Sequence, residues 1–505
     1  MMQQAPALTI AILLLTAFWV PIFGMVKRES AYYISLTAMF FSFLAACATL
    51  YAVVTTGPIH YRMGGWPPPW GIEFVIDYLN AGVLVLISLI SLLTTVSAKK
   101  SVEREIHRSK WPLFWSLYLL LVMSLMGMTE TGDMFNMYVY LEVSSLTAYG
   151  LIAMGEKGAL MASFNYVILG SVGASFYLLG VGYLYIATGS LNMADLSKIL
   201  PSIYRSKVIF TAFAFFIVGI GLKMGLFPLH MWLPDAYTHA PSAISTLIAP
   251  TMTKVSAYVF FRIILTVFNP HFSWEVIPAA TLLRWIAAVG IIYGSIMAIA
   301  QKDIKRMLAY SSISQIGYIV LGIALANRMG LIGGALHIFS HAFAKGSLFM
   351  VVMAVIYKTG IRNIDDFKGL NRKMPFTMAA FCLAAFSMVG VPPTAGFFSK
   401  WYLVLGTVAG KYWWLTAVIL ASSLLNAVYF FRIIEKIYFS SFVDLVTGGS
   451  GGHEHHELPA VAVAEAPLMM LVPILLMAAG ILAVGLFNTQ IIHHLLQFIV
   501  PKGLA

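Results

Sequence analysis

The chain has 505 residues, of which 60% are hydrophobic and only 10% are charged, and its mean hydropathy is +0.86. A soluble domain normally carries about 25% charged residues, so this composition excludes a string of soluble domains and indicates one large polytopic membrane domain. The net charge of +11 would suit a nucleic-acid-binding protein, but the basic residues gather in loops between apolar segments, which argues against that class.

Apolar runs long enough to cross a bilayer follow one another along the whole chain. At about 20 residues per crossing, they predict roughly fourteen membrane-spanning helices. Their expected limits are 6–26, 32–55, 77–97, 112–128, 133–153, 162–187, 208–233, 242–267, 275–300, 306–326, 331–357, 376–406, 412–440 and 466–487. The first run lacks a convincing small-residue cleavage site, so we expect a retained helix rather than a signal peptide.

Lysine and arginine are concentrated in alternate loops. Five of them lie between Lys99 and Lys110, after the third expected span, and five more between Lys358 and Lys373, after the eleventh. Positive charge in short loops marks the cytoplasmic side. We therefore expect a multi-pass protein of the cytoplasmic membrane, with cytoplasmic odd-numbered loops and both termini outside.

The fifth expected span contains two carboxylate residues, Asp133 and Glu142. Glu142 follows Asp133 by nine residues, which places it about 13 Å deeper along a helix. Asp133 can reach the interface, whereas Glu142 needs a cation nearby to remain charged. Lys223 is the expected partner. A static ion pair that joins two helices is the structural alternative, although desolvation leaves such pairs little net stability.

Lys223 and Lys254 lie in two successive apolar runs. An ionisable group near the bilayer centre costs about 2.5–3.5 kcal/mol, so such residues indicate a functional site. A buried lysine with a movable counter-ion can take up and release a proton. His230 and His239 lie between the two lysines and are secondary candidates for bridging them through water. His239 is alternatively a structural cap at the Ala240-Pro241 break.

Two proline-containing segments predict interrupted helices. They are Gly225–His230, followed by Trp232–Asp235, and Gly390–Gly396. Proline removes a hydrogen-bond donor and clashes with the preceding turn, and such breaks persist at membrane depth only inside protein or beside water. Lys223 comes just before the first break and Lys400 just after the second. Proline kinks that serve packing alone are the alternative.

The eleventh expected span carries a stripe of titratable side chains. His337, His341 and Lys345 recur every four residues, so they lie on one face of a helix. Histidine titrates near neutral pH, which suits proton hopping. Ser311 and Ser312 on the preceding span are positioned to hold water along such a route. Helix packing through polar side chains is the alternative.

The remaining candidate ligands predict no metal site. Cys47 and Cys382 lie in separate apolar spans, without the spacing of a metal or redox centre. The Gly/Ser run 447–452 predicts a flexible linker. The His/Glu run 453–457 predicts a polar surface loop, since nothing preorganises its ligands. We expect no metal and no cofactor in this chain, and any redox centre in another subunit.

Four segments resemble the signature of the proton-conducting antiporter-like family. They are Leu222–Ser242, Asp303–Ser312, His337–Lys345 and Gly390–Lys400. This family includes the antiporter subunits of respiratory complex I, the Mrp-type sodium/proton antiporters and the membrane-bound hydrogenases. The four motifs keep the family order, and the resemblance extends from residue 75 to residue 440.

The resemblance implies an all-α fold of fourteen transmembrane helices, with helices 7 and 12 broken and helices 4–8 and 9–13 forming two inverted repeats. The implied parts of this chain are 1–111 for helices 1–3, 112–267 and 275–440 for the repeats, 441–465 for a flexible loop and 466–505 for helix 14. It also implies a proton path. The path residues are Glu142, Lys223, Lys254 and Lys400, together with a helix-11 carrier that is one of His337, His341 and Lys345.

The branch of the family is indicated by the segment Gly64–Asn80, which is similar to the one before helix 3 in the Mrp D type and its hydrogenase relatives. We therefore expect an Mrp D-type proton-translocating subunit of a cation/proton antiporter, a hydrogenase or a ferredoxin-driven complex. Its expected partners are other membrane subunits, including small Mrp-like ones. A complex I subunit, a stand-alone secondary transporter and a non-conducting scaffold are the alternatives.

Overall fold

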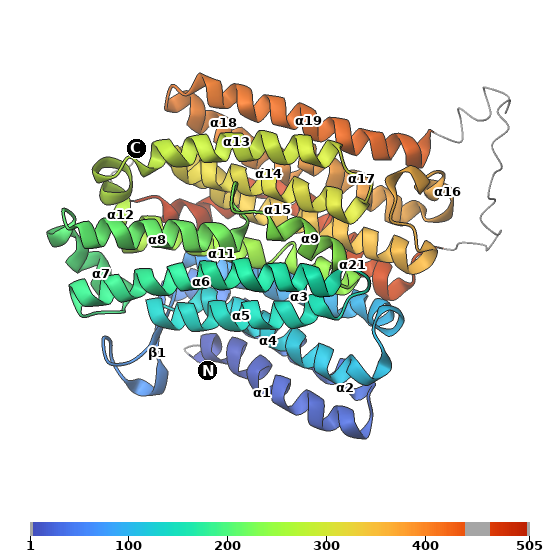
Figure 1. Cartoon of the computed structure of the whole chain (residues 1–505), viewed down its shortest axis with the longest axis horizontal. Coiled ribbons are helices and arrows are strands. Elements are labelled where there is room, and N and C mark those ends of the chain that lie inside the picture. Colours follow the sequence, from blue (N-terminus) through green and yellow to red (C-terminus); the bar gives the residue numbers. More distant parts are fainter. Residues whose placement is uncertain (1–3, 440–464, 502–505) are drawn as a thin grey trace.

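Long helices that run side by side along one axis make up almost the whole molecule (Figure 1). This computed structural model describes residues 4–439 and 465–501, so the expected linker and His/Glu loop lie outside the described residues. Six long helices come first. They are α1 (Ala5–Val26), α2 (Ser30–Thr56), α3 (Tyr78–Glu105), α4 (Trp111–Glu130), α5 (Met134–Ala153) and α6 (Ala159–Thr188).

The middle of the chain contains two interrupted helices and the most deeply buried ones. Its elements are α7 (Met193–Ile199), α8 (Lys207–Met224), α9 (Trp232–His239), α10 (Ser242–Ile248), α11 (Met252–Arg262), α12 (Asn269–His271), α13 (Ala279–Ile299), α14 (Ile304–Ala324) and α15 (Arg328–Thr359). The last part comprises α16 (Leu370–Lys373), α17 (Pro375–Val389), α18 (Ala395–Ala409), α19 (Trp413–Tyr438), α21 (Leu468–Leu486) and α22 (Asn488–Ile491).

The expected polytopic membrane fold is confirmed. Twelve helical segments of the described residues are long and apolar enough to cross a membrane. Helix α5 and the interrupted pair α17–α18 run parallel to them, which accounts for the fourteen expected crossings. The inverted repeats and the five-part division of the chain stay predictions.

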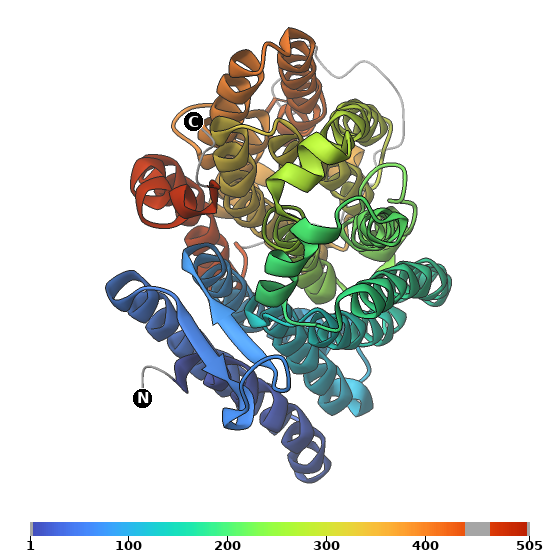
Figure 2. The ribbon, with the colours of Figure 1, turned by 90° about the vertical axis from the view of Figure 1, so that its left-hand side faces the viewer.

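Helices that follow one another in the sequence also follow one another, for the most part, from one edge of the bundle to the other. Viewed along the helices, α1 and α2 lie at one edge and α18 and α19 at the opposite edge (Figure 2). Helix α15 lies between them and packs against α3, α10, α14, α17, α18 and α21. Its central position explains why this 32-residue helix is buried along nearly all of its length.

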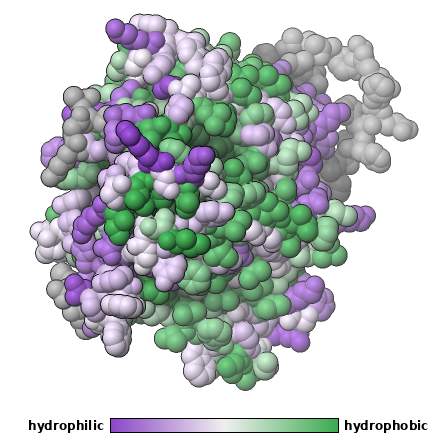
Figure 3. Space-filling view, turned by 60° about the vertical axis from the view of Figure 1, so that its left-hand side comes forward, coloured by the Kyte–Doolittle hydropathy of each residue, from purple (hydrophilic) through white to green (hydrophobic). Residues whose placement is uncertain are grey.

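On the face shown in Figure 3, a band of hydrophobic residues lies between two more polar ends. Large apolar side chains are exposed on α1, α2, α6 and α19, for example Phe18, Phe41, Ile186 and Leu424. Exposure of such large apolar surfaces to water is unfavourable. They are therefore suited to contact with lipid or with neighbouring membrane proteins.

Both predicted helix breaks are present. Helix α8 ends at Gly225 and α17 ends at Gly390, and each glycine adopts a left-handed backbone conformation, with φ of 74° and 97° respectively. Side chains other than glycine rarely tolerate this conformation, so these glycines fix where each helix stops. The proline-containing segments that follow keep the backbone irregular until α9 and α18 begin.

A third break was not predicted. The eighth expected span is divided into α10 and α11, which are separated by a turn at Ala249–Thr251. Pro250 lies in this turn and removes one backbone donor. A single proline inside a long apolar run was a weaker signal than the glycine-flanked segments of the other two breaks.

A small β-hairpin is an addition to the expected all-helical fold. Strand β1 (Ile59–Arg62) pairs antiparallel with β2 (Glu73–Ile76), and Ile59 lies opposite Ile76. The hairpin lies at the same end of the bundle as α7 and α12. Its Glu73 carbonyl accepts a hydrogen bond from the Gly132 amide at 2.9 Å, which ties it to the turn between α4 and α5.

Helices α14 and α15 touch through glycine, which gives a stability prediction. A Cβ atom at Gly322 would lie 2.6 Å from the Cα of Gly334, too close without a backbone shift. Overpacking of this kind costs about 1–3 kcal/mol, so Gly322→Ala should lower the melting temperature of the detergent-solubilised protein. Gly182→Ala is the matched control, because no atom lies within 4 Å of its added Cβ. Equal melting temperatures for the two variants would contradict the close contact.

Candidate functional site

The candidate site is a row of ionisable side chains buried across the bundle, from α5 to α18. Helix α15 supplies its centre, where His337, His341 and Lys345 are essentially fully buried. The two imidazole rings lie nearly parallel, with their centroids 5.9 Å apart. The four-residue spacing thus forms one continuous polar stripe, as the sequence predicted.

Lys345 is held by α14 rather than by a carboxylate. Its Nζ donates to the Leu308 carbonyl at 2.6 Å and to the Ser311 Oγ at 2.5 Å. Ser311, which we expected to hold water along the route, contacts Lys345 directly in this structure. The Ser312 hydroxyl instead donates to the Leu308 carbonyl at 3.0 Å, within its own helix.

His337 connects the centre of the row to the second break. Its Nδ1 lies 2.9 Å from the Ser399 Oγ, and its Nε2 lies 3.0 Å from the Gln315 Oε1. The Ser399 hydroxyl in turn donates to the Gly396 carbonyl at 3.1 Å. One chain of hydrogen bonds therefore runs from the α15 stripe to the first turn of α18, next to Lys400.

Lys400 fills the second break. Its Nζ donates to the Met388 carbonyl at 2.8 Å, to the Val389 carbonyl at 3.0 Å and to the Ser423 Oγ at 3.1 Å. The two carbonyls belong to the last residues of α17. A helix C-terminus leaves its carbonyls without backbone donors and carries partial negative charge, so the break itself provides the site for this cation.

Lys254 has the same arrangement at the third break. Its Nζ donates to the Ala249 carbonyl at 2.6 Å and contacts the Thr253 Oγ1 at 3.2 Å. Ala249 directly follows α10, whose C-terminal end faces the lysine. The break that the sequence did not reveal is therefore the one that accommodates Lys254.

Lys223 does not form the expected ion pair in this structure. Its Nζ donates instead to the Ser145 Oγ at 2.6 Å, and Glu142 lies one turn earlier on α5. None of the ion pairs formed by the described residues includes Lys223, Lys254, Lys345 or Lys400. Glu142 is half-buried, and the Lys223 ammonium contacts Ser145 on the same helix rather than Glu142.

Two buried histidines have unused hydrogen-bonding capacity. Neither ring nitrogen of His230 or His341 has a hydrogen-bond partner among the described residues. His341 lies among Lys254, Lys345 and His337, whereas His230 lies beside Phe227 and Tyr293. Buried polar groups are normally satisfied by protein or ordered water. Both histidines are therefore expected to bind water.

The remaining candidates lie away from the row. The Asp133 carboxylate caps α5 by accepting the Asn136 amide at 2.7 Å. The His239 Nδ1 lies 3.0 Å from the Lys157 carbonyl. His239 lines a surface cavity of about 260 Å³ together with Glu105 and Lys305. This contact joins His239 to the loop before α6 and is not a cap at the Ala240-Pro241 break.

Lys305 and Glu130 are among the buried ionisable residues that sequence reasoning missed. Lys305 is buried and donates to the Ala240 carbonyl at 2.6 Å. Glu130 is fully buried at the end of α4. The Thr9 Oγ1 lies 2.6 Å from the Pro6 carbonyl and 2.5 Å from the Glu130 Oε1. Lys305 and Glu130 both lie at the ends of expected spans, where charge is ordinary.

The four signature segments converge on this row. A family model described as NADH:quinone oxidoreductase/Mrp antiporter, transmembrane, matches residues 131–426. The chain belongs to this family. The match begins just before α5 and ends within α19, so it contains all the residues of the row.

Known relatives support this membership. NADH-quinone oxidoreductase subunit N of Desulforudis audaxviator is 48% identical over 459 residues, which cover 90% of each protein. The D-type subunit of the Na(+)/H(+) antiporter of Alkalihalophilus pseudofirmus is 33% identical over 368 residues, which cover 72% of this chain and 73% of that protein. Family relatives of both the complex I and the Mrp type therefore match, and the Mrp D type stays a prediction.

Solved structures share the fold. A chain of the membrane-bound sulfane sulfur reductase, an archaeal respiratory membrane complex, is 31% identical, with a TM-score of 0.87 and coverage of 98% of this chain and 97% of that one. A chain of the Mrp complex from Dietzia sp. DQ12-45-1b is 24% identical with a TM-score of 0.86 and covers 98% and 96%. Each matched chain is part of a membrane complex, in agreement with the expected membrane-subunit partners.

The separation of Glu142 from Lys223 generates a prediction. Glu142→Gln keeps the shape of the side chain but removes its negative charge. A nearby negative charge favours the protonated form of a lysine, so we expect the pH profile of ion translocation by the reconstituted complex to shift, or activity to be lost. An unchanged profile would reduce Glu142 to a structural brace between helices.

Proposed function

We propose that this chain is the proton-translocating, antiporter-like subunit of a multi-subunit membrane complex. One observation carries the proposal: Lys223, Lys254, Lys345 and Lys400 are buried in the bundle, and their ammonium groups are held by hydroxyls and backbone carbonyls rather than by fixed carboxylates. A lysine that is not locked in an ion pair can exchange its proton, as a carrier must.

The proposed path follows the row across the bundle. Protons pass between Lys223, Lys254 and the α15 stripe, and from His337 through Ser399 towards Lys400. His341 is the proposed central carrier on α15, because its two free ring nitrogens allow water to bond to both sides of the ring. An imidazole can accept a proton at one nitrogen and release one from the other.

The cavity lined by Glu105, His239 and Lys305 supports access from one face. Its lining residues lie in the odd-numbered loops or at the helix ends next to them, and we expect this side to be cytoplasmic from the distribution of positive charge. The Lys305 Nζ contacts the Ala240 carbonyl at the start of the α9–α10 connection. We propose that cytoplasmic protons reach the broken eighth span through this cavity.

For the parent complex, we propose a cation/proton antiporter of the Mrp type, or a membrane-bound hydrogenase or ferredoxin-driven respiratory complex, in which this chain is the Mrp D-type component. The segment before α3 supports the Mrp-like type. The subunit N relative, at 48% identity, supports the complex I-like alternative. In each case the redox or partner chemistry belongs to other subunits. A stand-alone transporter differs in one respect, since the purified chain alone would exchange cations for protons in liposomes.

Lys223→Ala tests the proposal directly. The variant removes a carrier from the last turn of α8 but keeps Gly225, which ends the helix, so ion translocation by the reconstituted complex should be lost although the complex still assembles. Lys207→Ala is the matched control, because Lys207 is exposed at the start of the same helix. Translocation is followed with a pH-sensitive dye inside proteoliposomes. Full activity in the assembled Lys223→Ala complex would overturn the proposal.

A further inference from the structure

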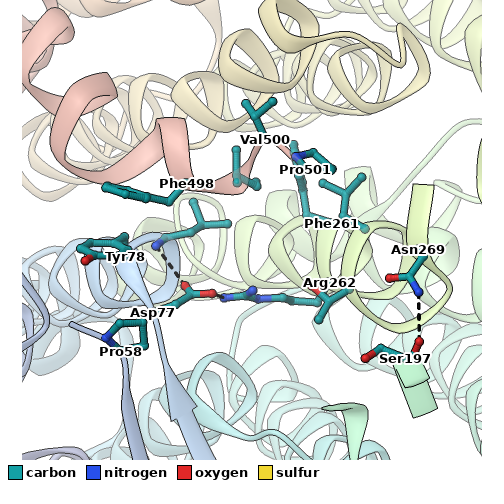
Figure 4. Close-up of a pocket in the computed structure, with 14 residues that line it drawn as sticks. Pro58, Asp77, Tyr78, Ser197, Phe261, Arg262, Asn269, Phe498, Val500 and Pro501 are labelled. Carbon is teal, nitrogen blue, oxygen red and sulfur yellow. Dashed lines mark hydrogen bonds and ion pairs between the residues drawn. The ribbon is translucent and has the colours of Figure 1, made fainter. Parts of the chain in front are cut away.

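A second cavity opens at the end of the bundle that carries β1, α7 and α12. It has a volume of about 470 Å³ and is formed by the start of α3, the end of α11 and the last described residues of the chain (Figure 4). Pro58, Ser197 and Asn269 on its lining follow even-numbered spans, so the proposed topology places this cavity on the non-cytoplasmic face.

An ion pair between Asp77 and Arg262 lines this cavity. The Arg262 guanidinium donates to the Asp77 Oδ2 at 2.5 Å, and both side chains are partly exposed, at 17% and 30%. The Asp77 Oδ1 accepts the amides of Leu79 and Asn80 at 3.0 and 3.2 Å. Asp77 is therefore fixed as the N-cap of α3, while Arg262 is the last residue of α11.

Arg262 lies on the same helix face as Lys254. Lys254, Tyr258 and Arg262 recur every four residues of α11, so they follow one face over about 12 Å. Lys254 and Tyr258 are buried. This face leads from the central row to the cavity, and sequence reasoning recognised only its first residue.

The Tyr258 hydroxyl is fully engaged in this structure. It accepts a hydrogen bond from the Arg262 Nε at 2.7 Å and donates to the Thr129 carbonyl at 3.1 Å. Tyr258 lies between Lys254 and Arg262 on this face of α11. While Arg262 pairs with Asp77, its guanidinium stays hydrogen-bonded to the Tyr258 hydroxyl.

We propose that the Asp77–Arg262 ion pair is a gate that controls proton exchange between Lys254 and water in this cavity. The inference rests on the proposed function and adds a non-cytoplasmic access point to it. When the pair separates, Arg262 leaves Tyr258. Lys254 then loses one proton through water, the Tyr258 hydroxyl gains one and releases one, and cavity water takes it up.

Few other ionisable groups surround the gate. Tyr78 lines the cavity and stacks on Phe498, with ring centroids 3.9 Å apart. Glu130 directly follows Thr129 in α4, but no ion pair joins it to Arg262 among the described residues. The charge at the gate therefore comes from Asp77 and Arg262 themselves, which makes the pair the element to alter.

The test uses the intact complex in proteoliposomes with an imposed pH gradient and an internal pH dye. Asp77→Asn removes the charge but keeps an oxygen that can cap α3, and Arg262→Gln breaks the pair from the other side. Each variant should collapse the gradient severalfold faster than wild type. The double variant should be no faster than either single one, because both remove the same interaction. Glu29→Gln, which breaks the exposed Arg108–Glu29 pair, should leave the leak unchanged.

Adding Lys254→Ala to Asp77→Asn decides the route. If the leak passes through the gate to Lys254, the added substitution should return it to the wild-type level. A leak that persists without Lys254, or Asp77→Asn and Arg262→Gln complexes that assemble and leak no more than wild type, would overturn the gate. These outcomes are distinct from failure of the proposed function, which would show as wild-type complex without translocation or as active Lys223→Ala.

Discussion

Buried lysines without carboxylate partners are the constraint around which this bundle is organised. A charged or strongly polar group in an apolar interior must be hydrogen-bonded, yet a strong ion pair would hold the proton in place. The structure meets both requirements by breaking helices. At Lys400 and Lys254, a proline-containing turn ends one helix early and turns its last carbonyls towards the ammonium group. Lys223 and Lys345 rely on serine hydroxyls in a similar way.

This arrangement explains why the broken helices and the lysines occur together. Backbone carbonyls stabilise the ammonium group without carrying a full negative charge. No unpaired carboxylate is therefore left behind when the lysine loses its proton. Glu142 is the carboxylate of the row, and in this structure the Lys223 ammonium contacts Ser145 rather than Glu142. The two surface cavities lie beside the two ends of the divided α10–α11 span. Lys254 lies between them, so this span is the proposed point at which the row exchanges protons with both faces.

The sequence predicted the spans, two of the three breaks and the buried stripe, because each has a strong local signal: apolar length, glycine beside proline, or a four-residue period. It could not predict the turn at Pro250, since one proline in a long apolar run does not by itself show that the helix is interrupted. It also missed Glu130, Lys305 and Arg262, which lie at span ends where charge is common. Their burial arises from helices distant in the chain, such as α1 against α4, and no local pattern records that contact.

The most direct measurement is a map of ordered water in the intact complex, determined in a lipid nanodisc at a resolution that shows individual waters. His341 has two buried ring nitrogens without protein partners among the described residues, and proton transfer along the row requires water at both. The proton-path proposal predicts waters bonded to His341 and continuing towards Lys254 and Lys345. A dry, apolar contact around His341, with no water between these three residues, would contradict it.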